Sequence, residues 1–445
     1  SMEILTNPVT VSVVVLCVLC LLKLNVLMSL IISALVAGVM GGMAQGIGLR
    51  EAIEGTMGTL TSGFAVNGST GLAYVLLGTF ATAIAAIGLA DMASKKLSKL
   101  MGGKGGSVLL LILAGVACLS QNLVPVHIAF IPIMIPPLLS MFNEMKIDRR
   151  GVACALAFGL KAPYIAIPFG FGAIFQEIIY SNLTNNGMEA TASDVASVNW
   201  MLAVCMFIGL LIAIFVTYRK PREYKMLAVD TSASDAVSDK FTTAHMVTLV
   251  AIAVVVVVQV PTENLALSAL CGLLVMFIGQ AIKWNEIDDQ FAGGIKIMGM
   301  IAIVMLVAGG FSDVIKSTGA VDALVAAAAD AMRGNKIVAA TVITLIGLLV
   351  TMGIGSSFST VPVLATLYVP LCDAMGFSMP ATIILMSAAA ALGDAGSPAS
   401  DTTLGPTSGL NADGQHNHIW DTCVPTFIHY NIPLMLGAII ISQII

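Results

Sequence analysis

Most of the sequence consists of apolar blocks of about 17–23 residues, which is the length that an α-helix needs to cross a bilayer. Lipid offers no hydrogen-bond partners, so such blocks must satisfy their own backbone groups, as a helix does. Hydrophobic residues make up 58% of the chain and charged residues only 10%, whereas soluble domains carry roughly 25% charged residues. We therefore expect an all-α integral membrane protein that passes several times through the lipid bilayer of a bacterial inner membrane.

The sequence lacks the common signatures of catalysis. It has no His-Glu-x-x-His pair, no Rossmann fingerprint and no Walker phosphate loop, because Gly102-Gly-Lys-Gly-Gly106 has no Ser or Thr after its lysine. No basic patch suggests nucleic acid, and the eight cysteines are scattered through apolar stretches. We therefore expect no enzyme, no cofactor and no nucleic-acid partner. Without an ATP site, transport would have to be driven by an ion gradient.

Lysine and arginine are distributed unevenly between the loops. Basic residues both precede and follow segment 107–142, which places both of its ends in the cytoplasm. This segment is therefore predicted to be a re-entrant hairpin. Extending the alternation gives about 10 transmembrane helices and two hairpins. In this layout 15 Lys and Arg residues lie in cytoplasmic loops, 4 lie outside, and Lys161 lies within the membrane.

The predicted layout repeats once with the opposite orientation. Each half has two spans, a short amphipathic surface helix, a third span, a hairpin, a broken helix and a last span. The first half begins outside and the second begins inside, so we expect two inverted repeats with helices broken near the midplane, as in many secondary transporters. The predicted boundaries are 1–217 for the first repeat (hairpin 107–142, broken helix 151–180), 218–243 for a cytoplasmic linker, and 244–445 for the second repeat (surface helix 287–298, hairpin 337–372, broken helix 381–403).

Four polar interruptions mark the candidate binding site. They occupy 120–127, 159–164, 355–362 and 393–403, two in each half. Gly and Pro interrupt the helical hydrogen bonds there, which frees carbonyl groups for a cation and N–H groups for a carboxylate. Side chains at these breaks are the predicted substrate contacts: Gln121, Asn122, His127, Lys161, Ser356, Ser357 and Thr360.

Lys161 and Asp394 occupy equivalent places in the two repeats. Lys161 lies about eleven residues into its span, or roughly 16 Å along a helix. A charge at that depth is costly unless it is paired, hydrated or neutralised. One interpretation is a structural ion pair of Lys161 with Asp394 or Asp401. The other is that the lysine replaces a bound cation in the first repeat, while the aspartates serve the second.

The motif Gly393-Asp394 … Ser397-Pro398 … Ser400-Asp401-Thr402-Thr403 resembles the signature of the NhaC-type Na+/H+ antiporter family. The opening Leu5–Pro8 and the ending His418–Pro433 are similar to its YuiF-like branch, whose members are named Na+/H+ antiporters or amino-acid permeases, notably for histidine. The resemblance implies Na+ or H+ as the coupling ion. The implied ion ligands are Asp394, Ser397, Ser400, Asp401 and Thr402, with Na+ at Asp394 and Asp401. The stretch Gly355–Thr360 departs from the Gly-Thr-Ser-Trp-Gly-Thr type of these antiporters.

Two functions follow from these features. The first is ion-coupled uptake of an amino acid, with histidine suggested by the family branch, because a zwitterion needs both the N–H and the carbonyl ends of broken helices. The second is Na+/H+ antiport, for which Asp394 and Asp401 alone would suffice. A channel is a third class, and the symmetric helix breaks argue against it. The sequence is compatible with a homodimer but does not determine the oligomeric state.

Overall fold

The computed structural model describes residues 2–122, 131, 134–229, 235–262, 264–354, 357–398 and 400–445, and only the backbone at residues 20, 21, 70, 90, 94, 98, 297, 301, 353, 354, 359 and 401. Within these ranges the chain is helical and contains no strand. The first half comprises α1 (Met2–Thr6), α2 (Pro8–Leu21), α3 (Val26–Ala44), α4 (Leu49–Ser62), η1 (Gly63–Asn67), α5 (Gly68–Ile87), α6 (Leu89–Met101), α7 (Gly106–Asn122), η2 (Pro136–Leu138), α9 (Leu139–Glu144), α10 (Arg149–Ala166), α11 (Phe171–Asn185), α12 (Ala192–Ile212) and η3 (Ala213–Thr217).

The second half repeats this order of elements. It comprises α14 (Thr243–Thr262), α15 (Leu265–Ile278), η4 (Trp284–Glu286), α16 (Ile287–Ser317), α17 (Val321–Met332), α18 (Lys336–Ile354), α19 (Ser357–Ala374), α20 (Met379–Ala391), α21 (Asp401–Leu410), η5 (His418–Cys423), α22 (Val424–Thr426), η6 (Phe427–Asn431) and α23 (Ile432–Ile444).

Several helices begin at residues whose side chains cap the free backbone N–H groups. Asn25 accepts from Leu27 and Met28 at the start of α3, and Ser378 accepts from the Ala381 N–H at the start of α20. Thr191 and Asp194 form a reciprocal capping box at the start of α12. Such caps satisfy donors that have no partner within the helix.

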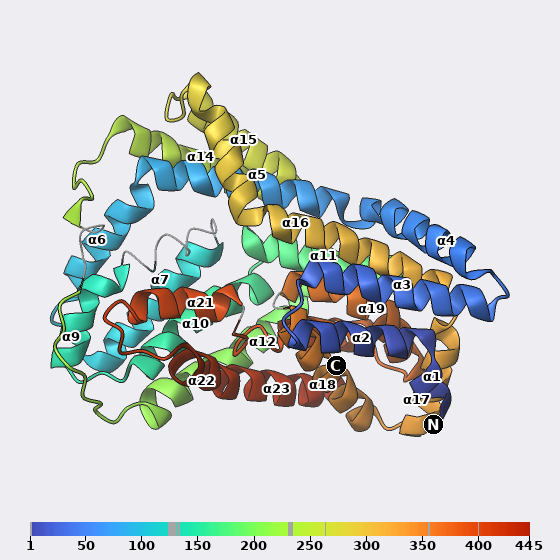
Figure 1. Ribbon diagram of the computed structural model, residues 1–445. Coiled ribbons are helices and arrows are strands. Elements are labelled where there is room, and N and C mark those ends of the chain that lie inside the picture. Colours follow the sequence, from blue (N-terminus) through green and yellow to red (C-terminus); the bar gives the residue numbers. More distant parts are fainter. Residues whose placement is uncertain are drawn as a thin grey trace.

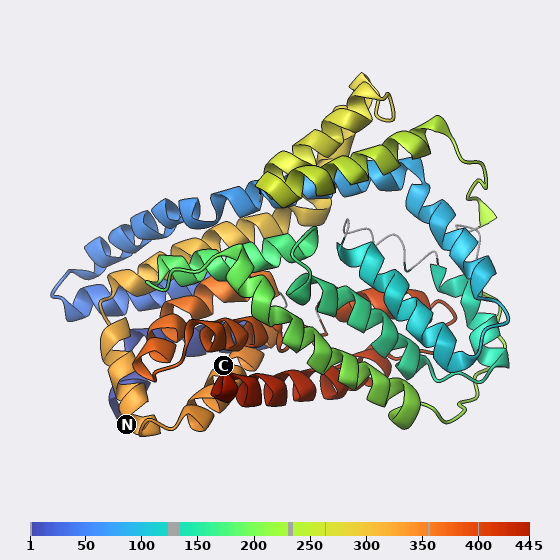
Figure 2. The same cartoon turned by 180° about the vertical axis from the view of Figure 1, so that it is seen from behind.

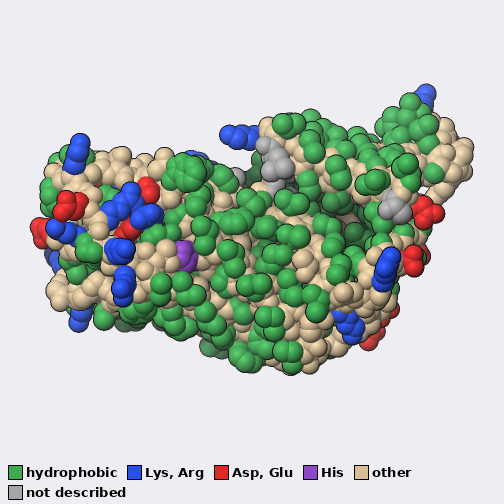
Figure 3. Space-filling view, turned by 90° about the horizontal axis from the view of Figure 1, so that it is seen from below, with side chains coloured by type: hydrophobic (Ala, Val, Ile, Leu, Met, Phe, Trp, Pro, Cys, Tyr) green, Lys and Arg blue, Asp and Glu red, His purple; other side chains and the backbone are tan. Residues whose placement is uncertain are grey.

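The apolar helices confirm a multi-pass membrane protein. Among the described residues, five helical stretches are long and apolar enough to span a membrane: Val26–Ala44, Ala192–Thr217, Thr243–Thr262, Met298–Ser317 and His418–Ile444. Two bent pairs add to these, Leu49–Asn67 with Gly71–Ile87 at 55° and Arg149–Ala166 with Phe171–Asn185 at 48°. The space-filling view shows an apolar belt between two ends where the charged side chains gather (Figure 3).

Contacts between loops define the two charged ends. At the first end the segment after α12 runs past α9 and α6 to reach α14 (Figure 1), and Lys95 and Lys146 pair with Asp239 and Glu223 of this segment. Elsewhere Lys316 Nζ donates to the Asn185 carbonyl at 3.2 Å, and nearby Asn7 Nδ2, close to the N terminus, donates to the Ala320 carbonyl at 3.0 Å. The loops that carry Lys95 and Lys146 thus lie beside the linker, and the loops that carry Lys316 and Asn185 lie beside each other.

Equivalent helices of the two halves pack antiparallel. A Cβ on Gly78 of α5 would lie 2.8 Å from the carbonyl oxygen of Gly294 in α16, and one on Gly71 would lie 3.3 Å from Leu306 farther along. Small residues at such crossings let membrane helices approach closely. Antiparallel pairing of equivalent elements is what inverted repeats produce, and both faces of the arrangement can be followed in Figures 1 and 2.

Each half contains a segment that enters and leaves at one end of the molecule. In the second half, Lys336 Nζ at the start of α18 donates to the Gly376 carbonyl just after α19, at 2.8 Å. In the first half, a Cβ on Gly106 at the start of α7 would lie 3.7 Å from Ile147, which follows α9. Both segments therefore have their ends side by side, as predicted for hairpins 107–142 and 337–372.

The structure corrects one element and adds two. The predicted separate surface helix at 287–298 is wrong, because it is the first part of α16, a continuous helix of 31 residues. No proline lies between the amphipathic start of α16 and its apolar remainder, so the helical hydrogen bonds continue without interruption. The structure also has a short helix after each third span, α6 and α17, where the sequence analysis expected loops.

Candidate functional site

Helix ends from both halves meet in the buried interior of the protein. From the first half come the C-terminal end of α10 and the break that follows it. From the second half come the start of α19 and the break between α20 and α21. Tyr164 is fifteen residues beyond Arg149, which lies at the charged end, so it is about 22 Å into the apolar belt. This is the region where the sequence analysis placed the binding site.

The break in the second half lies between Ala391, where α20 ends, and Asp401, where α21 begins, and it overlaps the interruption proposed at 393–403. Gly393 and Gly396 both have a φ of 85°, a conformation that favours glycine. A Cβ on Gly393 would lie 2.7 Å from the Leu348 carbonyl oxygen, so space also requires a glycine there. The chain turns sharply at these two residues, and this turn directs Asp394 into the interior.

Asp394 is surrounded by hydroxyl groups. Its carboxylate is 7% exposed. Oδ2 accepts from Tyr164 Oη at 2.8 Å and from Thr402 Oγ1 at 3.2 Å, and Oδ1 accepts from Ser400 Oγ. The Ser400 oxygen also accepts from the Thr402 N–H and caps α21. The positive end of the α21 dipole therefore faces the carboxylate and stabilises its charge.

Tyr164 is a residue of the candidate site that the sequence analysis did not single out. Its hydroxyl lies 2.8 Å from Asp394 Oδ2 and 2.8 Å from Ser357 Oγ at the start of α19. It therefore joins the broken helix of the first half to the hairpin and the break of the second. A tyrosine within the interrupted stretch 159–164 was the available signal, since a buried tyrosine hydroxyl needs a partner.

The first broken helix is interrupted later than predicted. Residues 159–164 remain helical within α10, and the break lies at 167–170. Pro168 disfavours helix at the preceding residue, and Ile167 is extended with φ −92° and ψ 121°. Gly170 then has a φ of 63°. Pro163 is accommodated near the end of the helix.

Asn122 spans this first break. Its Nδ2 donates to the Phe169 carbonyl at 2.9 Å, and its Oδ1 accepts from the Gly172 N–H at 3.0 Å. Both interactions replace bonds that the helix lost. Gln121 is also buried, and its Oε1 has no hydrogen-bond partner among the residues described. Asn122 therefore fixes the backbone of the break, whereas Gln121 Oε1 is without a partner in the part of the chain that the structure describes.

Lys161 is fully buried at 0% exposure, and its Nζ has no hydrogen-bond partner within the described ranges. The ammonium thus makes no hydrogen bond to the Asp394 carboxylate, although the two charges interact electrostatically. This argues against a directly paired Lys161–Asp394 structural unit. A buried ammonium without a partner is costly unless something else pairs with it.

The remaining predicted residues are placed as follows. Thr360 and Ser397 are buried, and the Ser397 carbonyl accepts from Thr403 Oγ1. Two of the predicted substrate contacts, His127 and Ser356, lie outside the described residues. For Asp401 only the backbone is described, where it begins α21.

An aromatic cluster covers one side of Tyr164. The Phe358 ring centroid lies 5.2 Å from that of Tyr164 and 5.9 Å from that of Tyr74, and Phe171 and Phe175 complete the cluster. Edge-to-face contacts of this kind are favourable. The Tyr74 hydroxyl is buried without a partner in the described part of the chain. The cluster excludes water from the side of the site that faces α5.

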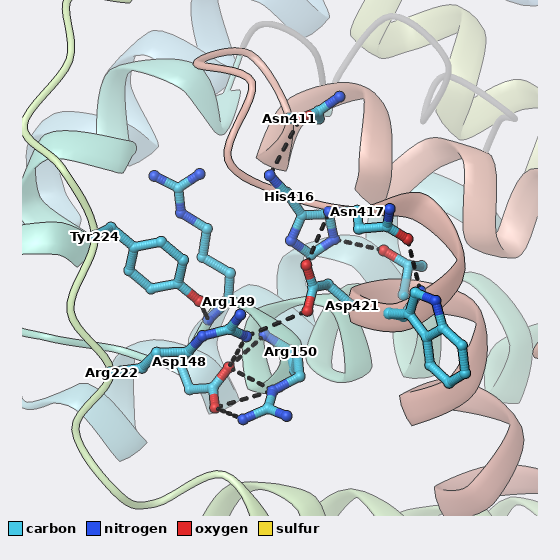
Figure 4. A network of polar contacts seen from close by, with 11 residues as sticks. Asp148, Arg149, Arg150, Arg222, Tyr224, Asn411, His416, Asn417 and Asp421 are labelled. Atoms are coloured by element: carbon cyan, nitrogen blue, oxygen red, sulfur yellow. Dashed lines mark hydrogen bonds and ion pairs between the residues drawn. The ribbon is translucent and has the colours of Figure 1, made fainter.

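A second polar network joins the broken helices at the linker end (Figure 4). Arg149, at the start of α10, binds both Asp413 oxygens at 2.7 and 2.6 Å, and both side chains are 0% exposed. The Arg149 guanidinium also stacks on Tyr224, and Arg222 pairs with Asp421 at 3.2 Å. The linker thereby ties the start of the first broken helix to the end of the second.

Titration in this network depends on burial and on neighbouring charges. Burial, with the nearby Arg149 and Arg222 charges, lowers the pKa of His416 to about 4, so the ring is neutral at pH 7. Burial alone would raise the pKa of Asp413, but hydrogen bonds from Arg149 and Gln415 outweigh it and hold that pKa below its ordinary value. Asp413 is therefore charged at neutral pH.

We expect Arg149→Met to destabilise the protein by about 3–5 kcal/mol at pH 7, because it leaves a buried carboxylate unpaired. Since the folded-state pKa of Asp413 is depressed, the contribution of the pair is present above the unfolded pKa, about 3.9, and is lost as pH falls through the folded value. Melting temperatures in detergent between pH 3 and pH 8 measure this. Arg50→Met is the control for an exposed pair, since the Arg50 and Glu54 side chains are 91% and 65% exposed and their pair should contribute about 1 kcal/mol or less.

These features define a class of protein. Apolar helices, antiparallel halves, and helix breaks that meet at a buried carboxylate are the features of a secondary transporter. Two solved structures share the fold. The YdaH transporter of Alcanivorax borkumensis has a TM-score of 0.61 with 14% identity, covering 88% of each chain. MtrF of Neisseria gonorrhoeae, described as an antimetabolite efflux pump, also has a TM-score of 0.61, with 16% identity over 89% of this chain and 85% of its own.

Residues 155–440 match the Na+/H+ antiporter family, and residues 7–101 match a second Na+-H+ antiporter family. An uncharacterised membrane protein of Vibrio parahaemolyticus is 46% identical over 99% of this chain and 100% of its own. YuiF of Bacillus subtilis, provisionally named an amino acid transporter, is 45% identical over 88% of this chain and 90% of its own. The chain belongs to the Na+/H+ antiporter family.

Proposed function

We propose that the protein couples the movement of Na+ or H+ to the uptake of an amino acid, with histidine as the favoured substrate. The single observation that carries the proposal is the buried Asp394 carboxylate among the hydroxyls of Tyr164, Ser400 and Thr402. We propose Ser397 and Asp401 as further ligands of the same cation, and Ser357 as a contact of the substrate. Carboxylate and hydroxyl oxygens are hard ligands that suit a small cation.

The same hydroxyls allow the site to alternate between a cation-free and a cation-bound state. A hydroxyl has one donor and two acceptor lone pairs, and it can rotate. Without a cation, three hydroxyls donate to the carboxylate and stabilise its charge. When a cation binds, they can turn their lone pairs toward it. A proton on Asp394 would compete for the same oxygen atoms, which is how one site can respond to either ion.

The environment of Lys161 is evidence that the substrate carries an anionic group. Its buried ammonium has no partner among the described residues, and the carboxylate of an amino acid would supply one. The free Gln121 acceptor could then face the substrate ammonium or an imidazole N–H. The name of the Bacillus subtilis relative points in the same direction for the substrate class.

Na+/H+ antiport is the alternative. It is favoured by the family match and by the fact that the Asp394 site needs no organic substrate to exchange a cation for a proton. In both functions we propose that residues 1–217 and 244–445 are the inverted repeats, that the end carrying linker 218–243 is cytoplasmic, and that a homodimer is compatible with the fold.

The two functions are separated by ligand-dependent stability and by flux. If the protein binds histidine, saturation at 100 times Kd stabilises it by about 2.7 kcal/mol, which raises the melting temperature by several degrees. The rise should be larger in Na+ than in choline. Labelled histidine should enter proteoliposomes only with an imposed Na+ or pH gradient. No stabilisation by any of twenty amino acids, together with Na+-driven proton movement, would establish the antiporter instead.

A further inference from the structure

Two buried asparagines that take no part in the proposed binding contacts occupy equivalent places in the two halves. Asn199 lies in α12 and Asn431 ends η6, so each is on the last span of its half, with exposures of 0% and 2%. Asn199 Nδ2 donates to the Ile165 carbonyl at 3.1 Å, and Asn431 Nδ2 donates to the Ala395 carbonyl at 2.9 Å. Each amide therefore reaches the broken helix of its own half.

Asn431 forms hydrogen bonds with the backbone on both sides of Asp394. Its Oδ1 accepts from the Gly393 N–H at 3.4 Å, while its Nδ2 binds the Ala395 carbonyl. A peptide N–H requires an acceptor and a carbonyl requires a donor, so the two contacts together set the orientation of the amide. One side chain thus holds the peptide groups on both sides of the carboxylate. Because backbone direction sets side-chain direction, Asn431 aims Asp394.

Asn199 makes one such contact next to Tyr164, the partner of Asp394; its Oδ1 has no hydrogen-bond partner among the described residues, and Gln176 Nε2 donates to the same Ile165 carbonyl at 3.2 Å. The Ile165 carbonyl that Asn199 holds directly follows Tyr164, whose hydroxyl donates to Asp394 Oδ2 at 2.8 Å. In the hydrogen bond between the two halves, Tyr164 is the donor and Asp394 is the acceptor. Asn199 contacts the backbone next to the donor, and Asn431 contacts the backbone next to the acceptor.

The two last spans form one support. A Cβ on Gly209 of α12 would overlap the His429 carbonyl oxygen, and one on Gly437 of α23 would overlap the Cys205 sulfur. The helices therefore touch backbone to backbone and run antiparallel. Asn431 ends a π-helical stretch, Phe427–Asn431, and such wider turns shift the direction of the side chains that follow. The close contact fixes the two spans relative to each other, and the π-helical stretch affects the direction of Asn431 alone.

We propose that Asn431 and Asn199 are positioning residues. They lie on the two packed last spans and orient Asp394 and Tyr164 toward each other. This orientation sets the affinity of the site for its coupling cation. The positioning is independent of what the protein transports. The consequence for cation affinity rests on the proposed function.

Hydrogen–deuterium exchange of the detergent-solubilised protein tests the positioning directly. In Asn431→Ala, amide exchange within 392–400 should be at least tenfold faster than in the wild type. Asn182→Ala is the matched control, because Asn182 is equally buried at 1% but donates only within its own helix, to the Ile178 carbonyl. Asn199→Ala should speed exchange in 165–170. If Asn431→Ala does not fold, Asn431→Gln, whose amide lies one methylene farther out, provides the same comparison. Unchanged exchange in 392–400 overturns the proposal.

Transport kinetics test the consequence. Asn431→Ala should raise the KM for the coupling cation at least tenfold and change the maximal rate less than twofold, while Asn182→Ala changes neither. Suppose that transport by the wild type is cation-coupled and that Asn431→Ala exchanges faster but keeps the wild-type KM for the cation. That result would overturn the link between positioning and cation affinity. If the wild type shows no cation dependence, the proposed function fails, and the exchange result still decides whether Asn431 positions the break.

Discussion

Asp394→Asn is expected to abolish cation-coupled transport, by at least 100-fold, in a protein that still inserts and folds. The amide has nearly the shape of the carboxylate. Its oxygen can accept from Tyr164 and Thr402 in the place of Oδ2, and its NH2 group can donate to the Ser400 hydroxyl once that hydroxyl has rotated. The amide lacks the negative charge that a small, hard cation requires at the centre of its ligands. It also cannot take up and release a proton in the physiological range, so neither coupling ion would be bound.

The measurement is gradient-driven uptake into proteoliposomes, together with the melting temperature in Na+ and in choline. Asp373→Asn is the control, since it removes the same charge from an exposed position at the end of α19. The mutant should melt near the wild-type temperature but lose its stabilisation by Na+. Full Na+- or H+-dependent transport in Asp394→Asn would mean that the cation site lies elsewhere.

Lys161→Ala is expected to reduce substrate transport by about 100-fold through a different route, the loss of a buried cationic partner for the substrate carboxylate. Because Lys161 Nζ has no hydrogen-bond partner among the described residues, its removal should leave the melting temperature unchanged or higher. Asp394 keeps three hydroxyl donors, which stabilise its charge without the lysine. The loss should therefore appear in the KM for substrate.

The competing interpretation, a structural ion pair, gives the opposite pattern. In that case Lys161→Ala and Asp394→Ala would each lower the folded yield, and the double mutant would fold better than either single mutant. Lys316→Ala is the control for loss of a lysine, since Lys316 is at the surface and donates only to the Asn185 carbonyl. A destabilised Lys161→Ala whose yield is restored by Asp394→Ala would refute a role in substrate binding.

The class of fold could be predicted from the sequence because it depends on local properties. The length of an apolar block determines whether a helix can span the bilayer, and basic loops determine which ends lie on the same side. The polar stretch 393–403 could likewise be recognised as a break, because Gly393 and Gly396 cannot be replaced within the turn that they form. Asp394 was identified from its place equivalent to Lys161 in the repeat and from the resemblance of its motif to the antiporter signature.

The exact place of the other break depended on neighbouring residues that a motif search overlooks. Gly159, Lys161 and Pro163 suggested an interruption, yet α10 continues to Ala166, because Pro168 and Gly170 stop it and Pro163 does not. Similarly, the amphipathic stretch 287–298 continues into the third span of the second half as one helix, and hydrophobic periodicity alone does not show where one helix ends and the next begins.

The sequence by itself determined that this chain is a helical membrane protein, which loops lie together, and which carboxylate lies deep in the membrane. Only the tertiary structure decided what surrounds that carboxylate. Tyr164 is 230 residues away from Asp394 along the chain, and the amide of Asn431 reaches Gly393 and Ala395 from another helix. Hydrogen bonds require distances near 3 Å and defined angles, and the packing of antiparallel helices brings these groups within that range.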